Sequence, residues 1–495
     1  MKKLLYSICL LLSPCLHSIG AEYQNISKLD WTLNGKKVTL PHSYEYRLES
    51  GRITNEIRAP AGTYRVTLPK DVRRADDGSR YFLRIDGGMQ SIKVLVNGVE
   101  VGWHETGFVP ETYEITGFLN NTETNSLKIV TTRMKYLSTG GDYLKFLGLF
   151  ADVWLIKTGN GEDFSPYKPL AKPKLSYGED GFFHDDAGQR VFLKGVNYHA
   201  YFPPYGTFDY DYEREREDLM LIKQMGANAI RTSHYLRNPR FYDTCDELGL
   251  YVFTEIPLNG TMDTNNVKYW MEYAEKTIRA YGHHPCIIAW GIFNELHYKY
   301  IPEVTMLRDY MHDLDPSRPT YGASSMGIPF EISRLPDIFG VNIYCGWYSG
   351  AVADMVKLLK SIHRKTWHPT FFITEYGAGG NVNQKSGDVD EQAIKKMKPV
   401  EFVQDGHTNV VYRPVSPNKN PWHPADYQLY YHENAWDAIS RSSYCQTNCA
   451  GVFIWQMFDS AAPRREGGST NLNTKGLMTI DRKPKPAYEF YKKVW

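Results

Sequence analysis

The strongest constraint on the fold of this chain is a rhythm of apolar runs and amphipathic segments that repeats from residue 181 to the C-terminus. Each apolar run has the length of a buried strand, and each segment after it has the spacing of a surface helix. The runs cover residues 191–198, 227–232, 251–255, 287–293, 320–323, 338–344, 370–375 and 451–456. Eight such units fit one closed (β/α)8 barrel. A doubly wound open sheet is the alternative, but no glycine-rich phosphate loop follows the first run, so the barrel is favoured.

The N-terminal part of the chain has a different pattern, in which short alternating runs are bounded by turn residues. Residues 64–68 and 81–85 alternate as the strands of a half-buried sheet do. Asn97-Gly98 separates two further runs and is a typical tight hairpin turn. We therefore predict a signal peptide over 1–21, a β-sandwich over 22–160, a linker over 161–180 and a barrel domain over 181–495.

The N-terminus has the plan of a cleavable secretory signal. Two lysines precede an apolar run over 4–12, and small residues follow before Ala21. This run is too short to span a bilayer. Pro14 stands where a lipoprotein signal needs a small residue before Cys15, so a lipid anchor is disfavoured. The sequence thus predicts a secreted or periplasmic protein without a membrane span.

Charge and cysteine content argue against several other classes. The 57 Lys and Arg residues balance 56 Asp and Glu residues, and no dense basic stripe is present, so nucleic acid is not an expected partner. Cys245, Cys286, Cys345, Cys445 and Cys449 are scattered and odd in number, which is neither a disulfide framework nor a metal cluster. Cys445 and Cys449 are close enough to bridge in an oxidising compartment, and isolated buried thiols are the open alternative.

The fourth predicted strand leads into Asn294-Glu295, and the seventh ends on Glu375. Parallel barrel strands present their C-terminal ends on one face, so both carboxylates should project into the same mouth. Retaining glycosidases need one carboxylic acid to protonate the leaving oxygen and one carboxylate, about 5–5.5 Å away, to attack the anomeric carbon. A strand-end acid can instead cap a helix or pair with an arginine, but two acids at matching strand ends favour catalysis.

Longer motifs around these glutamates resemble those of family 2 glycoside hydrolases, the family of β-galactosidases and β-glucuronidases. In the barrel they are Gly195-Val196-Asn197-Tyr198-His199, Arg231-Thr232-Ser233-His234-Tyr235, Asn294-Glu295, Thr374-Glu375-Tyr376-Gly377, Trp455-Gln456-Met457-Phe458-Asp459 and Asn473-Thr474-Lys475-Gly476-Leu477. Segments 38–42 and 96–104 are similar to the family's sugar-binding jelly roll. The resemblance implies a jelly-roll β-sandwich before the barrel, with Glu295 as acid/base and Glu375 as nucleophile.

The resemblance also gives roles to four residues around the two glutamates. Asn294 would bond the sugar 2-hydroxyl, a contact that tightens as the oxocarbenium-like state forms. Tyr344 would hold Glu375 through its phenol, Arg231 would orient the same carboxylate, and Trp455 would form the floor of the pocket. A structural amide, a core tyrosine, an arginine paired with another acid and a buried core tryptophan are the respective alternatives.

Three further residues, two histidines and an aspartate, are expected to contact the sugar. His199 and His234 follow the first two strands, where the family's histidines contact hydroxyls. Asp142 would reach the sugar from the sandwich, unless it is a solvated surface acid. An immunoglobulin-like domain normally separates jelly roll and barrel, but only the linker fits between Gly159 and the first barrel strand. This domain is therefore expected to be absent, and the sandwich must approach the barrel by another route.

Neither a metal nor another cofactor is expected. Some relatives bind magnesium through a Glu-x-His pair after the third strand, but Glu255-Ile256-Pro257 lacks the histidine. Residues 381–421 form a long polar stretch, and stretches of this length in compact domains are usually functional, so we expect it to shape the pocket rim.

The resemblance implies a glycoside or oligosaccharide as the partner and allows an oligomer. The C-terminal motifs are most similar to the β-galactosidase branch, so an exo-acting β-galactosidase is the first hypothesis. A β-glucuronidase is the alternative, because Asn473 and Lys475 match the Asn-x-Lys that recognises a uronic carboxylate in those enzymes, although galactosidases of the branch carry comparable runs. A non-catalytic carbohydrate-binding protein is the second alternative, and the presence of both glutamates argues against it.

Overall fold

The computed structural model describes residues 20–44, 47–49, 52–54, 61–74, 77–133, 146–202, 208–260, 262, 266–325, 330–348, 350–383, 400–404, 407–411, 424–462 and 472–495. Three sequence predictions fall largely outside these ranges: the signal peptide, Asp142 and most of the 381–421 stretch. Those three predictions stay predictions.

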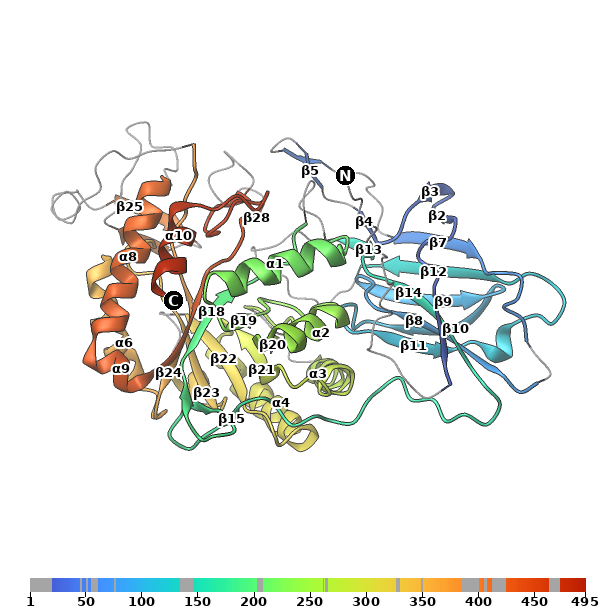
Figure 1. Ribbon diagram of the computed structural model, residues 1–495, viewed down its shortest axis with the longest axis horizontal. Helices are drawn as coiled ribbons and strands as arrows, with labels where there is room; N and C mark the ends of the chain where they lie inside the picture. Colours follow the sequence, from blue (N-terminus) through green and yellow to red (C-terminus); the bar gives the residue numbers. More distant parts are fainter. Residues whose placement is uncertain are drawn as a thin grey trace, which may run out of the picture.

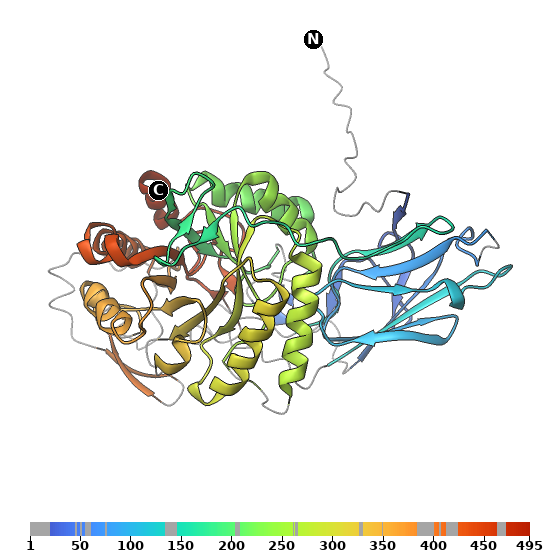
Figure 2. The ribbon, with the colours of Figure 1, turned by 90° about the horizontal axis from the view of Figure 1, so that it is seen from below.

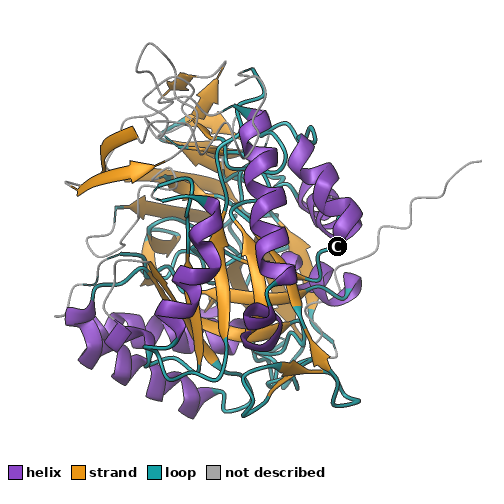
Figure 3. Cartoon of the chain, turned by 90° about the vertical axis from the view of Figure 1, so that its left-hand side faces the viewer, coloured by secondary structure: helices purple, strands orange, loops and turns teal. Residues whose placement is uncertain are grey.

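Eight parallel strands close into a barrel, and helices surround it (Figure 1 and Figure 3). In order around the barrel they are β18 (Leu193–Asn197), β19 (Ala229–Arg231), β20 (Tyr251–Glu255), β21 (Ile287–Asn294), β22 (Thr320–Ser325), β23 (Ile338–Asn342), β24 (Phe371–Tyr376) and β27 (Cys449–Ile454). β21, β23, β24 and β27 are buried along their whole length, as expected for parallel strands that are covered on both faces. The strands overlap the eight predicted runs, so the predicted (β/α)8 barrel is confirmed.

The helices follow the strands in the expected alternation. They are α1 (Tyr212–Gln224), α2 (Pro239–Leu248), α3 (Val267–Tyr281), α4 (Ile301–Leu314), α5 (Phe330–Ser333), α6 (Met355–His363), α8 (Ala425–Arg441), α9 (Ser443–Asn448) and α10 (Pro486–Val494), with short 3-10 turns η1 (Thr116–Phe118), η3 (Tyr298–Tyr300) and η4 (Val352–Asp354). The sequence explains where α2 begins and ends: the Asn238 side chain caps its start, Pro239 occupies the first turn, and Gly249 ends it at φ 71°.

A small three-stranded sheet closes the N-terminal end of the barrel. It consists of β15 (Ser176–Tyr177), β16 (Phe183–His184) and β17 (Arg190–Val191). The Phe183 ring meets Phe253 and Phe372 edge-on, with centroids 5.8 and 6.1 Å apart. The segment predicted as a linker therefore ends in this sheet, because Gly181, at φ 78°, permits the turn that returns the chain under the barrel. The opposite, C-terminal end of the barrel stays available for polar side chains.

The N-terminal domain is rich in β-structure, as predicted. One sheet has the order β1 (Glu22–Asn25), β14 (Val153–Thr158), β8 (Arg80–Ile85) and β11 (Glu111–Glu114). The other has the order β10 (Val99–His104), β9 (Ser91–Val96), β12 (Ser126–Thr132), β7 (Ala61–Thr67), β2 (Trp31–Leu33) and β3 (Lys36–Val38). Asn97 and Gly98, at φ 51° and 84°, form the predicted hairpin between β9 and β10.

Four short antiparallel pairs complete the described strands. They are β4 (His42–Tyr44) with β13 (Leu147–Leu149), β5 (Arg47–Glu49) with β6 (Arg52–Thr54), β25 (Val400–Gln404) with β26 (His407–Val411), and β28 (Ser460–Ala461) with β29 (Leu472–Asn473). The last pair lies beyond the end of β27 and carries residues of the candidate site.

The sandwich packs directly against the barrel (Figure 2). The Phe108 ring, from the loop before β11, stacks on Tyr235 of the barrel with centroids 4.9 Å apart. Nearby, Lys276 of α3 forms an ion pair of 2.5 Å with Glu111 of β11. Residues 159–175 are all described and contain no strand, so no immunoglobulin-like domain separates the two parts.

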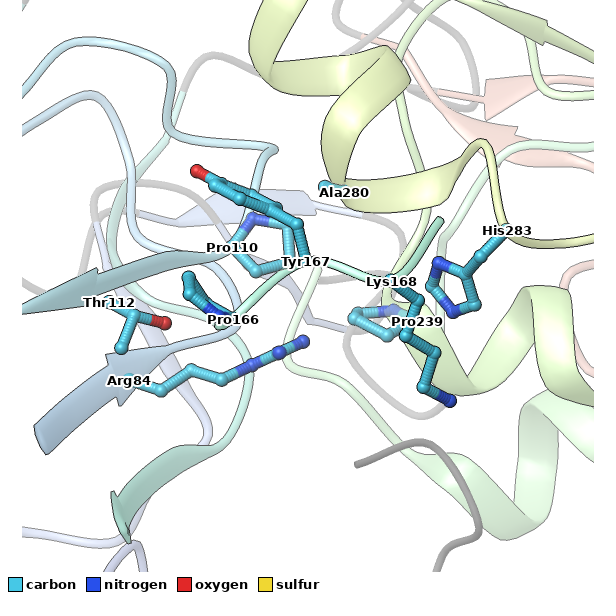
Figure 4. A pocket seen from close by; sticks show the side chains of 9 residues that line it. All are labelled: Arg84, Pro110, Thr112, Pro166, Tyr167, Lys168, Pro239, Ala280 and His283. Atoms are coloured by element: carbon cyan, nitrogen blue, oxygen red, sulfur yellow. The ribbon is translucent and has the colours of Figure 1, made fainter. Parts of the chain in front are cut away.

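The linker fills part of this junction. Pro166, Tyr167 and Lys168 line a cavity of about 20 Å³ together with Arg84 of β8 and His283 after α3 (Figure 4). A cavity of this size has room for about one water molecule, so the contact between the two domains is nearly closed here.

The cysteines and the hydropathy of the helices bear on two of the sequence predictions. The five cysteines of the described chain are buried and unbridged, so Cys445 and Cys449 are separate thiols. Within the described ranges, no helix is both long enough and apolar enough to cross a membrane.

Candidate active site

Both predicted catalytic glutamates lie at the C-terminal end of the barrel. Glu375 belongs to β24 and is only 5% exposed. Glu295 directly follows β21, is half-buried and has a left-handed backbone at φ 49°. Its backbone N–H donates to the Ala323 carbonyl at 2.7 Å, which holds this conformation against the neighbouring strand. The barrel thus brings the two carboxylates to one mouth, as the strand pattern predicts.

The Glu375 carboxylate is held on both oxygens. Arg231 Nη1 donates to Oε1 at 2.8 Å, and the Tyr344 hydroxyl donates to Oε2 at 2.7 Å. His234 Nε2 lies 3.7 Å from Oε1. Burial, together with the negative charge of Glu375, raises the pKa of Tyr344 well above its usual range, so this phenol remains a donor. Charge-assisted bonds of this kind fix the orientation of a carboxylate.

Arg231 is fully buried and connects four polar side chains at the base of the site. Besides Glu375, it donates to Glu255 Oε1 at 2.6 Å, to Asn197 Oδ1 at 3.0 Å and to Asn294 Oδ1 at 2.8 Å. Burial raises the pKa of Glu255, but the charge of Arg231, the charge of His234 and the hydrogen bonds from both side chains together outweigh it, so the pKa is lowered overall. The guanidinium is therefore shared between two acids.

Asn342 connects the strands that carry the two glutamates. Its Nδ2 donates to Glu295 Oε1 at 2.9 Å and lies 3.1 Å from Asn294 Oδ1. In the barrel register Asn342 is the direct partner of Glu375. It was not among the residues predicted for the site, although it lies two positions before Tyr344 at the end of the same predicted strand.

An aromatic wall stands beside the carboxylates. The Trp455 ring stacks on His234 and meets His199 edge-on, with both centroid distances 5.2 Å. The Tyr235 hydroxyl accepts from the backbone N–H of Ala200 at 2.9 Å, and it lies 3.2 Å from His199 Nδ1. All three predicted residues, Trp455, His199 and His234, are thereby brought together.

A buried lysine forms the other side of the site. Lys475 is 3% exposed, and its Nζ lies 5.2 Å from the Trp347 ring centre and 5.0 Å from that of Tyr348. The Tyr348 ring packs against Tyr344, which bonds the nucleophile candidate. No carboxylate among the described residues lies within 4.0 Å of Lys475 Nζ. The buried Nδ2 of Asn473 also has no hydrogen-bond partner within the described part of the chain.

The structure therefore gathers the predicted residues into one site, apart from Asp142, which lies outside the described residues. Sequence analysis missed Asn342, Glu255, Asn197 and Asn259; the last bonds the Asn294 amide at 3.0 Å. The motif containing Asn197 and the strand ending on Glu255 were visible, but their bonds to Arg231 were not. Over the described ranges, no cluster of three metal-ligating side chains occurs.

Comparison with known protein families identifies the barrel. The model described as "Glycosyl hydrolases family 2, TIM barrel domain" matches residues 187–436. The chain belongs to glycosyl hydrolase family 2. It is accordingly a glycoside hydrolase, and its substrate is a carbohydrate.

Several family 2 proteins are similar to this chain. A β-glucuronidase of Bacteroides fragilis is 24% identical over an alignment that covers 93% of this chain and 78% of that protein. A β-galactosidase of Thermoanaerobacterium thermosulfurigenes is 34% identical over 63% of this chain, but the alignment spans only 38% of that enzyme. A putative β-glucuronidase of Formosa agariphila is 28% identical over 62% of this chain and likewise is covered to only 37% of its length.

Solved family 2 structures have the same fold. A β-glucuronidase of Bacteroides uniformis superposes with a TM-score of 0.75 at 21% identity, over 96% of this chain and 69% of that one. A putative β-galactosidase of Bacteroides fragilis superposes with a TM-score of 0.77 at 22% identity, over 96% of this chain and 86% of that one. At these identities the likeness establishes the architecture and leaves the sugar open.

Proposed function

We propose that the protein is a retaining exo-β-glycosidase in which Glu375 is the nucleophile and Glu295 the acid/base. The proposal is supported by the barrel mouth, where two carboxylates occupy different surroundings. Glu375 is nearly buried and held on both oxygens by a guanidinium and a phenol, which fix the carboxylate in one orientation as an attacking nucleophile requires. Glu295 is more open and accepts from the neutral amide of Asn342, as a group that gives and takes a proton requires.

The reaction then proceeds by double displacement. Glu375 attacks the anomeric carbon while Glu295 protonates the leaving oxygen, so the glycosidic C–O bond breaks and an ester between sugar and Glu375 forms. Glu295, now a carboxylate, removes a proton from a water molecule while the water oxygen attacks the anomeric carbon. The ester bond to Glu375 breaks, and the sugar leaves with its configuration retained. Asn294, oriented by Arg231 and Asn259, is placed to bond the 2-hydroxyl as positive charge develops on the ring.

We further propose that the sugar is a β-linked uronic acid, so that the enzyme is a β-glucuronidase. The observation that carries this proposal is Lys475, a buried cation without an ion-pair partner among the described residues. Burying a charge is costly unless an opposite charge or sufficient donors and acceptors accompany it. A carboxylate at carbon 5 would supply the missing anion, and Asn473 Nδ2, which has no partner among the described residues, would donate to its second oxygen. The Bacteroides fragilis relative that aligns with most of this chain carries the same activity in its name.

β-Galactosidase is the second candidate. It is favoured by the C-terminal motifs, which are most similar to that branch, and by relatives with this name, such as the enzyme of Thermoanaerobacterium thermosulfurigenes. A galactoside carries a neutral hydroxymethyl at carbon 5, which would leave the Lys475 charge without a counter-ion among the residues that the structure describes. Cleavage of any chromogenic glycoside would exclude a non-catalytic binding protein.

The test compares nitrophenyl β-glucuronide with nitrophenyl β-galactoside in the wild type, in Lys475→Met and in Lys172→Met. Lys172 pairs with Asp186 on the surface and serves as the matched control. Removing one partner of a buried charge pair costs on the order of 2–5 kcal/mol, so kcat/KM for the glucuronide should fall by about thirtyfold or more in Lys475→Met only. Faster galactoside cleavage by the wild type, unchanged in Lys475→Met, would establish the second candidate instead.

A further inference from the structure

A second cavity lies on the junction between the two domains, away from the catalytic residues. Its volume is about 490 Å³, within the range of about 300–1,000 Å³ that is typical of small-molecule sites. The sandwich contributes the segment around Asn25 and the loop before β14, and the barrel contributes the loop after β18 and the starts of α1 and α2. None of the residues that contact Glu295 or Glu375 lines it.

The charge of the wall restricts what the cavity can bind. Four carboxylates, those of Asp152, Asp209, Asp211 and Glu213, face two cations, Lys28 and Arg240. The excess of negative charge disfavours a sulfate or a uronate. These acids do not form a group of three that could hold a metal ion within the described ranges. A neutral ligand whose hydroxyls donate to carboxylates therefore fits this wall best.

The polar side chains of the cavity wall are held in place by contacts with their neighbours. The Arg240 guanidinium lies 3.4 Å from the Asp152 carboxylate and 5.1 Å from the centre of the Tyr212 ring. Burial raises the pKa of Asp152 even though the charge of Arg240 opposes this. The Asp209 side chain accepts from the backbone N–H of Ser43 and so ties the barrel loop to the sandwich.

Aromatic rings complete the wall. Phe202, Tyr210 and Tyr212 all line the cavity, and the Phe202 and Tyr210 rings meet edge-on with centroids 6.3 Å apart. Flat rings beside acceptor carboxylates are the combination that recognises a pyranose, because the sugar has an apolar face and a rim of hydroxyls. We propose that this cavity is a second carbohydrate site, which binds an uncharged sugar unit of the glycan outside the catalytic pocket.

The position of the cavity connects it to the active site. Phe202 lies on the same loop as His199, which follows β18 and packs against Trp455. A glycan held here would stay close to the barrel mouth between rounds of cleavage, so the site would raise the turnover of long glycans and leave small glycosides unaffected. This inference goes beyond the proposed function and holds whichever sugar is cleaved.

The test measures binding of lactose, cellobiose and xylobiose, with inorganic sulfate as the anionic probe, by saturation-transfer NMR and calorimetry. Glu375→Gln serves as the background, so that no probe is hydrolysed. Tyr212→Leu and Glu213→Gln alter the cavity. Their matched controls are Tyr310→Leu, a half-buried tyrosine on α4, and Glu217→Gln, one turn further along α1.

We expect at least one neutral disaccharide to bind, and each cavity variant to weaken it about tenfold while both controls leave it unchanged. Binding that survives both cavity variants would place the sugar in the catalytic pocket and overturn the proposal. The absence of neutral-sugar binding, or a preference for sulfate, would overturn it as well. Activity on nitrophenyl glycosides is measured separately, so failure of the proposed catalytic function cannot be mistaken for failure of this site.

Discussion

At the scale of single residues, Arg231 determines how the acids of the site are arranged. It is shared between Glu255 and Glu375, while Tyr344 bonds the second oxygen of Glu375. Glu295 accepts from the neutral amide of Asn342 and is more exposed. The two glutamates thus differ in surroundings although both end a barrel strand, and this difference separates their proposed roles.

The acid/base role of Glu295 predicts a dependence on the leaving group. Glu295→Gln should slow cleavage of alkyl glycosides strongly but spare nitrophenyl glycosides, because only poor leaving groups need protonation. In Glu295→Ala, azide should restore turnover and give the β-glycosyl azide, which NMR of the product identifies. Formation of the α-azide would exchange the two assignments.

Some of these residues could be predicted from the sequence and others could not. Glu295, Glu375 and His199 directly end or follow apolar runs, so their places at the barrel mouth follow from the strand pattern. Asn342 was missed because a register shift after Val341 places it opposite Glu375, and such a shift leaves no mark in the sequence.

At the scale of elements, the loop before β11 reaches from the sandwich to the active site. Phe108 stacks on Tyr235, and the Tyr235 hydroxyl bonds His199 Nδ1 and the backbone of Ala200. The sandwich thereby supports a residue that is placed to contact the sugar. The strands on either side of this loop can be predicted from the sequence pattern. The contact of the loop with the barrel cannot, because it depends on the path of the linker.

Tyr235 is accordingly a positioning residue. Tyr235→Phe keeps the ring but removes the hydroxyl that bonds His199 Nδ1 and the backbone N–H of Ala200, so kcat/KM should fall about tenfold with little change in Tm. In a His199→Ala background the same substitution should have almost no further effect on kcat/KM. Tyr242→Phe, which removes a hydroxyl bonded to Thr254, is the control. Additive losses from Tyr235→Phe and His199→Ala would assign Tyr235 a purely structural role.

A second prediction at this scale concerns α8. Burial, followed by the charge of Lys485, lowers the pKa of His432 to about 3. The unfolded chain takes up a proton near the ordinary histidine pKa of 6.5, whereas the folded chain does so only near 3. His432 therefore imposes no cost above pH 6.5, and the free energy of unfolding falls by about 1.4 kcal/mol for each pH unit below it until pH 3.

The measurement is urea denaturation between pH 4.5 and 7, with the slope of the unfolding free energy against pH as the readout. His432→Gln should make this slope smaller, whatever its effect on stability at neutral pH. His104→Gln should do the same, because burial lowers the pKa of His104 to about 3 as well. An unchanged slope in both variants would show that these histidines titrate alike in the folded and unfolded chain.

At the scale of the whole molecule, the sandwich has an apolar core of its own and also contributes side chains to the main core of the barrel. Phe108, Phe146 and Phe150 of the sandwich belong to the same buried cluster as the barrel residues Phe208 and Tyr235. The absence of an intervening domain in the described chain makes this contact possible. The barrel and the β-rich domain were predictable from periodicity alone, but the shared core was not, because it joins residues far apart in the sequence.

This shared core predicts cooperative unfolding. Heating should give one calorimetric transition that coincides with the loss of both far-UV and near-UV circular dichroism, because the shared cluster couples the two domains even though the sandwich also has a core of its own. Phe108→Ala, which leaves a cavity at the contact, should lower the stability by about 3–5 kcal/mol and separate the two transitions. Two well-resolved transitions in the wild type would show that the domains unfold independently.

The most direct test of the central claim, that Glu375 is the nucleophile of a retaining glycosidase, is covalent trapping. A 2-deoxy-2-fluoro-β-glucuronyl fluoride has a good leaving group, and its fluorine slows hydrolysis of the ester, so the glycosyl-enzyme should accumulate. Mass spectrometry of the intact protein should show one added sugar, and peptide mapping should place it on Glu375. A label on any other residue, or fluoride release with inversion and no covalent intermediate, would contradict the account.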